Sequence, residues 1–234
     1  MTTLLVTGTG TGVGKTTVAA AVAALAGARG ERVVVVKPAQ TGEPDVGGGD
    51  IAEVLRRSPT AVGVELVRYP DPLSPAAAAR RSGRPALTRA GCLGAVQRAG
   101  ADAELVLVEG AGGLLVHYDD DGFTMADVAV ELGLRVLLVT TAGLGTLNAT
   151  ALTLEAMERR GLGLHGLVIG AWPAAPDLAA RSNVDDLARL AGTPLAGALQ
   201  DDAASLDAEA FLAAATAGLS PLLGGDFDPG SLSR

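Results

Sequence analysis

The sequence is poor in three kinds of residue: cysteine, aromatic residues and lysine. Aromatic residues make up 3% of the 234 residues, and Cys92 is the one cysteine. A single cysteine excludes a disulfide within the chain, which fits a reducing compartment. Of the 18 basic residues only Lys15 and Lys37 are lysines, and the others are arginines. Such a bias suggests that these two positions need a compact ammonium group, which a guanidinium cannot replace.

The sequence also lacks a basic excess, a long apolar run and a basic leader. The net charge is −8, which argues against a general nucleic-acid surface and against attraction to an anionic membrane. No apolar run reaches the roughly 18 to 20 residues that a membrane span requires. The first residues, MTTLLVT, read as the start of a strand and not as a signal peptide. We therefore expect a cytoplasmic protein with no nucleic-acid partner and no membrane partner.

Short runs rich in valine and leucine recur along the chain, with helix-like segments between them. The runs are continuous and not alternating, which is typical of strands buried on both faces of a parallel sheet. Strand–helix repeats predict an α/β fold: a doubly wound, mostly parallel sheet flanked by helices, in a single domain over residues 1–234. The predicted strands are residues 3–7, 32–37, 104–109, 135–141, 165–170 and 194–199. The predicted helices are residues 15–28, 50–57, 89–99, 124–132, 147–160, 183–191 and 207–217.

Three segments are predicted to lie outside this pattern. Residues 42–49, GEPDVGGG, read as a flexible loop. Residues 69–88 contain four prolines and an alanine run, so we expect a surface excursion there. The tail from about Ser220 is rich in glycine, proline and serine, and we expect it to fray.

A glycine-rich loop, GTGTGVGKTT from Gly8 to Thr17, separates the first strand from an alanine-rich helix. Strand, glycine loop, Gly-Lys-Thr and helix form the phosphate-loop arrangement, in which backbone N–H groups and the helix N-terminus surround phosphate oxygens. Lys15 could reach the β- and γ-phosphates, and the Thr16 hydroxyl could bind Mg²⁺. The loop is a variant, because Gly8 lies one residue too early for the strict pattern. A dinucleotide fingerprint fits less well, and an ordinary glycine turn capped by threonine is the remaining alternative.

The second lysine, Lys37, ends the second predicted strand in the segment VVVVKPAQTG. Ligands of open α/β sheets bind at the carboxyl edge, where the glycine loop also lies. We therefore expect Lys15 and Lys37 to converge on one anionic site. The alternative is a lysine at a strand end that points into water.

Two acidic residues are candidates for binding a metal ion. Glu109 ends the third predicted strand in LVLVEGAGG, and an acid at a strand end that faces a phosphate loop completes a Mg²⁺-nucleotide site. Asp50 follows three glycines and precedes a helix, so a metal ligand and a helix N-cap are equally good interpretations. Asp45, in the same loop, is a weaker competitor.

Four segments, in this order, resemble the motifs of the dethiobiotin synthetase family, which acts in the penultimate step of biotin synthesis. TGTGTGVGKT is similar to the family's variant phosphate loop, KPAQTG to its KP-x-x-[ST]-G motif, and VEGAGGLLV to its VEGAGG motif. LGTLNATALTLEAM is similar to its LG-x-x-N-H-x-x-LT segment. The match covers most of the chain and implies a phosphate-loop NTPase fold.

The resemblance implies a reaction and roles for particular residues. In it, 7,8-diaminopelargonic acid takes up CO₂ as a carbamate, the carbamate attacks the γ-phosphate of Mg-ATP, and the second amine closes a cyclic urea and releases phosphate. The catalytic residues would be Lys37 and Lys15. The metal ligands would be Thr16, Asp50 and Glu109. The nucleotide would bind to Gly12, Val13, Gly14, Lys15, Thr16, Thr17, Asp50, Glu109, Gly110, Ala111, Gly112, Gly170, Ala171, Leu199, Gln200 and Asp201.

The resemblance also implies a homodimer with shared sites. Thr11 and Thr41 would line the substrate site. The helix start at Gly145, Thr146, Leu147 and Asn148 would bind the tail carboxylate of a substrate held by the neighbouring subunit. A helix N-terminus suits a carboxylate, although a plain helix start is the alternative interpretation.

The sequence departs from the family at the expected base site. Where adenine-selective members often carry Asn-Asp, this chain has Gly170 and Ala171, which offer no side chain to read adenine. Gln200 replaces a proline of a later turn, and Ala149 replaces a histidine. We therefore expect a relaxed base preference, with CTP or other triphosphates accepted beside ATP.

Three other functions remain open on the sequence. A regulatory ATPase of the MinD/ParA type carries a signature lysine four residues before Gly14, and this chain has Gly10 there. A cobyrinate-type amidase requires a further glutaminase domain with a nucleophilic cysteine. The third alternative is a nucleotide-binding module without catalysis.

Overall fold

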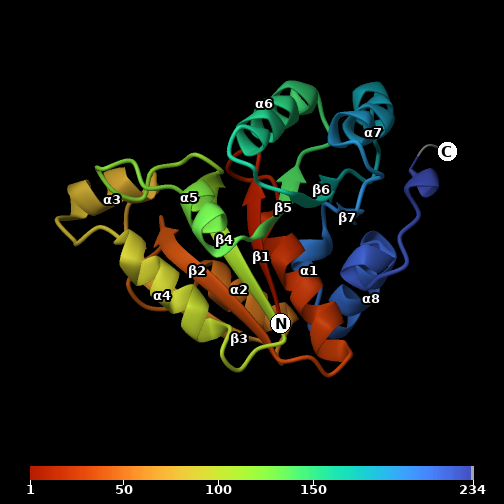
Figure 1. The fold of residues 1–234 in the computed structure, drawn as a ribbon. Coiled ribbons are helices and arrows are strands. Elements are labelled where there is room, and N and C mark those ends of the chain that lie inside the picture. The colour runs from red at the N-terminus through yellow and green to blue at the C-terminus, as the bar shows by residue number, and fades with distance from the viewer. Residues whose placement is uncertain (233–234) are drawn as a thin grey trace.

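A seven-stranded parallel sheet organises the protein (Figure 1), whose computed structural model describes residues 1–232. The strand order is β3-β2-β4-β1-β5-β6-β7, and all six neighbouring pairs are parallel. The predicted doubly wound α/β class is confirmed. The strands are β1 (Thr2–Gly8), β2 (Val33–Thr41), β3 (Val62–Tyr69), β4 (Leu105–Gly113), β5 (Arg135–Thr140), β6 (Leu164–Trp172) and β7 (Gly197–Gln200).

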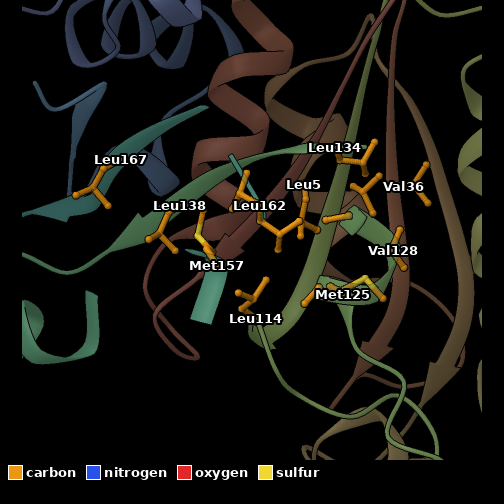
Figure 2. Close-up of a cluster of buried hydrophobic side chains, with 14 of the residues drawn as sticks. Leu5, Val36, Leu114, Met125, Val128, Leu134, Leu138, Met157, Leu162 and Leu167 are labelled. Carbon is orange, nitrogen blue, oxygen red and sulfur yellow. The ribbon is translucent and has the colours of Figure 1, made fainter. Parts of the chain in front are cut away.

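Helices cover both faces of the sheet, and each face has its own apolar core. One core contains side chains from α1, α2 and α8, and the other contains side chains from α3, α4, α5, α6 and α7. Figure 2 shows part of the second core, where Leu5 and Leu138 of the sheet meet Met125 and Met157 of the helices. The helices are α1 (Lys15–Ala28), α2 (Gly49–Arg57), α3 (Pro75–Ser82), α4 (Arg89–Ala99), α5 (Met125–Leu132), α6 (Thr146–Glu158), α7 (Leu178–Ala191) and α8 (Ala208–Gly218).

The central strands contribute to both cores because successive side chains of a strand point to opposite faces. In β4, Val106 and Val108 belong to one core, and Leu105 and Leu107 belong to the other. A strand that is buried on both faces has apolar residues at consecutive positions, which explains the continuous valine and leucine runs of the sequence.

Helix α1 is buried almost throughout. Every side chain from Val18 to Ala26 is at most 8% exposed, and six of these nine residues are alanines. Small side chains allow the helix to lie close to the sheet, with α2 and α8 packed on its other side. The loop that precedes α1 is therefore attached to the best-packed part of the molecule.

Several elements differ from the sequence-based expectations. Strand β3 was not predicted, because its residues are mostly half-buried and include Gly63, Glu65 and Arg68. Helix α3 forms within residues 69–88, where we expected only a surface excursion. The predicted strand 194–199 is observed as Gly197–Gln200, so it begins three residues later.

The tail after Ser220 is packed against both apolar cores in its described part. Between Ser220 and Leu232, where we expected fraying, Leu223 and Phe227 are buried, with 4% and 7% of their surface exposed. Two short 3₁₀ helices, Pro221–Leu223 and Pro229–Ser231, lie in this stretch.

Within the described residues, no helix is both long enough and apolar enough to cross a lipid bilayer.

Candidate active site

The carboxyl ends of β2 and β4 and the loop after β1 open onto one cavity of about 430 Å³. Lys15 and Lys37 both line it, although 22 positions separate them in the chain. The lining residues that the sequence predicted are Thr11, Gly12, Gly14, Lys15, Thr16, Thr17, Lys37, Thr41, Asp50, Glu109, Ala111 and Gly112. A larger cavity of about 560 Å³ lies near the starts of β2 and β3, but it is mostly apolar and contains none of the motifs.

The glycine loop wraps tightly around the start of α1. Gly12 and Gly14 have φ angles of 72° and 94°, which only glycine adopts at little cost. The Lys15 ammonium donates a hydrogen bond to the Gly10 carbonyl at 2.8 Å, so the side chain folds back over its own loop. The backbone turn and the lysine thus present positive charge and N–H groups to the same space.

Lys37 lies at the centre of a buried ionic cluster. Its ammonium contacts the Glu109 Oε1 atom at 2.9 Å and also forms an ion pair with Asp50. The Thr16 hydroxyl donates to the same Glu109 oxygen at 2.7 Å. Lys37 and Glu109 are 3% and 1% exposed, whereas Asp50 is 32% exposed. Lys37 and Glu109 are each the fifth of nine residues in β2 and β4, so both strands continue four residues past their predicted ends. Two strands, the start of α2 and the phosphate loop therefore meet in one cluster.

The structure distinguishes between the two interpretations of Asp50. Helix α2 begins at Gly49 with Gly48 as its N-cap, and Asp50 lies within the first turn. The Asp50 carboxylate forms an ion pair with Lys37, while Asp45 pairs instead with Arg84 at 2.7 Å. Asp50 thus belongs to the cluster, and Asp45 does not.

The cluster shifts the pKa values of its members in different directions. Burial lowers the pKa of Lys37, but Glu109 and Asp50 outweigh burial, so the net pKa is raised. Burial, helped by the charge of Lys37, lowers the pKa of Lys15 to about 8. Burial raises the pKa of Glu109 against the attraction of Lys37. Burial also acts to raise the pKa of Asp50, but the charge and hydrogen bond of Lys37 make the net shift downward.

The cluster also contains the oxygen donors that a small divalent cation requires. Thr16, Asp50 and Glu109 supply a hydroxyl and two carboxylates, and the buried Oε2 atom of Glu109 has no hydrogen-bond partner among residues 1–232. In the described part of the chain, no group of three or more histidine, cysteine, aspartate or glutamate side chains could hold a metal ion. Mg²⁺ binds through one or two carboxylates together with water and phosphate oxygens, so this donor set fits it.

Comparison with known proteins identifies the family. The sequence matches the family described as AAA domain over residues 2–209. The ATP-dependent dethiobiotin synthetase BioD of Parafrankia sp. (strain EAN1pec) is 56% identical over 234 residues, covering 100% of this chain and 98% of that protein. The protein with the same name from Streptomyces coelicolor is 53% identical over 228 residues, covering 97% and 96%. The chain belongs to the dethiobiotin synthetase family.

Solved structures support the fold assignment independently. A ParA family ATPase from Chlorobium tepidum aligns with a TM-score of 0.57 at 15% identity, covering 99% of this chain and 97% of that one. The cell division ATPase MinD of Pyrococcus furiosus aligns with a TM-score of 0.56 at 18% identity, covering 92% and 97%. At such low identity these likenesses show the phosphate-loop fold alone, and the dethiobiotin synthetase family is assigned from the sequence relatives.

The glycine at position 170 has a packing explanation. A Cβ atom on Gly14 would lie 2.5 Å from the Gly170 carbonyl oxygen, and a Cβ atom on Gly170 would overlap the Val13 carbonyl. The end of β6 therefore touches the glycine loop backbone to backbone. An asparagine at position 170 would require the loop to move.

The other predicted residues lie outside the cavity lining. Val13 and Gly110 are buried behind it. Ala171, Gln200 and Asp201 are exposed at the ends of β6 and β7, and Leu199 is 1% exposed in a core. The residues at the start of α6 do not line the cavity either: Thr146 is buried, Leu147 is half-buried, and Gly145 and Asn148 are exposed.

A hydroxyl network holds the start of α6. Thr140 at the end of β5 hydrogen-bonds to Thr146 at 2.7 Å and to Thr150 at 2.9 Å, and it lies 3.3 Å from the Thr9 hydroxyl of the glycine loop. Asn183 donates to the carbonyls of Ala142 and Gly143, at 2.8 and 3.1 Å. The contacts of Thr9 with Thr140 and of Asn183 with Ala142 join residues far apart in the sequence, and no quoted motif contains Thr140 or Asn183.

Three lining residues were not predicted: Ala39, Gln40 and Glu43. Gln40 lies within the KPAQTG motif, in which the sequence predicted roles for Lys37 and Thr41. The Gln40 side chain accepts a hydrogen bond from the Asp50 N–H at 2.9 Å. Simple alternation of side chains along β2 would place Gln40 on the face opposite to Lys37, so no pattern in the sequence indicated that both line one cavity.

Proposed function

We propose that the protein closes the cyclic urea of dethiobiotin from 7,8-diaminopelargonic acid, CO₂ and a nucleoside triphosphate. The main support is the shared cavity, in which Lys15 of the phosphate loop and Lys37 of β2 face the same space beside Asp50 and Glu109. A carbamate and a triphosphate are both anions, so their approach requires fixed positive charge between them. The relatives' printed names agree with this assignment.

The residues act in two groups. The glycine loop and Lys15 hold the β- and γ-phosphates, and a buried ammonium at this position attracts charge strongly because little water screens it. Lys37 holds the carbamate oxygen beside the γ-phosphate and stabilises charge as the phosphoryl group is transferred. The carbamate oxygen bonds to phosphorus as the diphosphate leaves, and the second amine then attacks the carbonyl carbon as phosphate leaves.

Thr16, Asp50 and Glu109 would hold Mg²⁺. When bound, this ion would neutralise charge on the phosphate oxygens. Glu109 is suited to the role because its buried Oε2 atom has no other partner. Thr11 and Thr41, which line the same cavity, would orient the diamine.

A homodimer would complete the substrate site. The N-terminal turn of α6 faces outward, and Leu144 beside it is 92% exposed. A helix N-terminus attracts a carboxylate, so this turn, with Asn148, would bind the tail of a substrate held by a second copy. Sedimentation of the protein would test this, because a monomer at working concentration would exclude a shared site.

A cytoplasmic location fits a single buried cysteine.

Product analysis tests the function directly. The protein is mixed with 7,8-diaminopelargonic acid, bicarbonate, Mg²⁺ and each of four nucleoside triphosphates, and the cyclic urea is sought by mass spectrometry. We expect the urea only when all components are present. Hydrolysis of the triphosphate at the same rate without the diamine, and no urea, would instead indicate a regulatory ATPase.

A further inference from the structure

Asp50 depends for its position on a loop with little packing of its own. Residues 42–49 connect β2 to α2, and only Gly49 among them is buried. Gly47, Gly48 and Gly49 have φ angles of 77°, 61° and 86°. Glycine loses more conformational freedom on ordering than other residues. Contacts from outside the loop must therefore hold it in one shape if Asp50 is to keep its place.

Arg68 of β3 supplies three of these contacts. Its Nη1 atom donates to the carbonyls of Pro44 and Gly47, both at 2.9 Å, and its Nη2 atom donates to the Gly48 carbonyl at 3.4 Å. Its Nε and Nη2 atoms also donate to the two carboxylate oxygens of Glu65, both at 2.7 Å. A guanidinium has five N–H donors, and here each of them has an acceptor.

The sheet register places Arg68 beside the residue that holds Asp50 directly. Gln40 of β2 is the register partner of Arg68 in β3, and the Gln40 side chain accepts the Asp50 N–H. A Cβ atom on Gly49 would lie 3.1 Å from both the Arg68 Nη2 atom and the Gln40 amide. The loop therefore closes over two adjacent side chains, and a side chain at position 49 would displace one of them.

A second arginine contact fixes the other side of the loop. Arg84 donates to both carboxylate oxygens of Asp45, at 2.7 and 2.9 Å, and to the Arg68 carbonyl at 2.9 Å. This ion pair is largely exposed, with side-chain exposures of 38% and 61%, so it contributes little alone. The Arg68 side chain is 18% exposed, which makes it the stronger of the two contacts.

We propose that Arg68 is the positioning residue for Asp50, holding the loop of residues 42–49 so that the Asp50 carboxylate stays in the cation-binding cluster with Thr16 and Glu109. This inference rests on the proposed function only in assigning Mg²⁺ to that cluster. Partners of metal ligands set ligand orientation, and their loss typically weakens metal affinity about 10- to 100-fold.

The test measures how nucleotide binding depends on Mg²⁺, by calorimetry with ATP, in the full-length protein. The variants are Arg68→Gln and Arg68→Lys; the second keeps a positive charge beside Glu65 but has only three donors on one nitrogen. The control is Arg56→Gln, because Arg56 also donates to backbone carbonyls, those of Ala204 and Leu206, but away from the cavity. Hydrogen exchange of the peptide spanning residues 42–52 is followed in parallel.

We expect both Arg68 variants to require about 10- to 100-fold more Mg²⁺ for half-maximal tightening of ATP binding. Their affinity for ATP in EDTA should stay at the wild-type value, and exchange should accelerate in residues 42–52 but not in the glycine loop. The Arg56 control should match the wild type in every measurement.

An unchanged Mg²⁺ requirement in both variants would overturn the proposal. So would an equal loss of ATP affinity with and without Mg²⁺, because that result indicates general damage to the fold. Full rescue by lysine would also overturn it, because a single ammonium would then replace the three hydrogen bonds on which the proposal depends. If the wild type formed no cyclic urea, the proposed function would fail, yet the Mg²⁺ dependence of ATP binding could still be measured and would judge Arg68 separately.

Discussion

Replacing Lys37 with glutamine tests the buried ionic cluster most directly. Among the described residues, the substitution removes the only cation that contacts Glu109, a carboxylate that is 1% exposed. Glutamine is similar in length and can still donate one hydrogen bond, so the change removes charge more than volume. Glu109 and Asp50 would then face each other without a positive charge between them.

The structure sets the size of the expected effect. At 2.9 Å and an effective dielectric constant of about 20, a pair of unit charges attracts by about 6 kcal/mol. Part of this attraction offsets the cost of removing both groups from water, and deletion of one partner of a buried pair typically costs about 3 to 5 kcal/mol. For a chain of this length, such a loss lowers Tm by roughly 6 to 20 °C.

The pH dependence of the loss provides an internal check. Burial raises the pKa of Glu109 in the folded protein, and Lys37 opposes this shift. Without Lys37 the folded state would bind a proton on Glu109 more readily than the unfolded state does. Stability of the variant should therefore fall as the pH rises above the ordinary carboxyl range, and the difference from the wild type should be smaller at pH 5 than at pH 8.

The assay combines thermal unfolding without ligands with product analysis. Arg29→Gln serves as control, because Arg29 pairs with Glu31 at 2.8 Å but is 46% exposed, and such exposed pairs contribute little. We expect Lys37→Gln to lower Tm, to retain nucleotide binding and to form no cyclic urea. A Tm equal to that of the wild type together with normal turnover would refute the argument for both stability and catalysis.

Three further predictions concern the same cavity. Lys37→Arg should also fail to form product, because the planar guanidinium is larger than the ammonium that Glu109 and Asp50 enclose; near-normal turnover would contradict this. ATP affinity without Mg²⁺ should fall as the pH rises through about 8, the pKa of Lys15, because only the protonated amine attracts phosphate. The fall should be at most about tenfold per pH unit. In Lys15→Gln the affinity should be weaker and should not change with pH. Values of kcat/KM for ATP, CTP, GTP and UTP should lie close together, because Gly170 and Ala171 carry no base-reading side chain, and strong preference for ATP would exclude the idea.

The sequence predicted the central part of the fold and site because they share one physical origin. Buried parallel strands require continuous apolar runs, and their carboxyl ends meet at one edge. Lys37 and Glu109, each placed on such a run, were therefore expected beside the phosphate loop, and the structure places them there. These inferences needed no knowledge of how distant loops pack.

The remaining features depend on packing that the sequence does not reveal. Strand β3 lies at the sheet edge, so its residues are half-buried and its apolar pattern is interrupted. For this reason the contact of Arg68 with the loop before Asp50 could not be predicted. Sequence reasoning also left Asp50 undecided, because aspartate suits a helix N-cap as well as a cation, and the observed N-cap at Gly48 excludes only the first of these interpretations.

The burial of α1 has a consequence for how this sequence can vary. Val18 to Ala26 have no solvent-facing side along which a larger side chain could extend. Extra methylene groups in a close-packed interior force neighbouring backbone to shift, and here the neighbouring elements are the central strands and helices α2 and α8. In a saturation-mutagenesis library, the alanines of this helix should therefore tolerate as few replacements as the ionic residues do, although none of them touches a substrate.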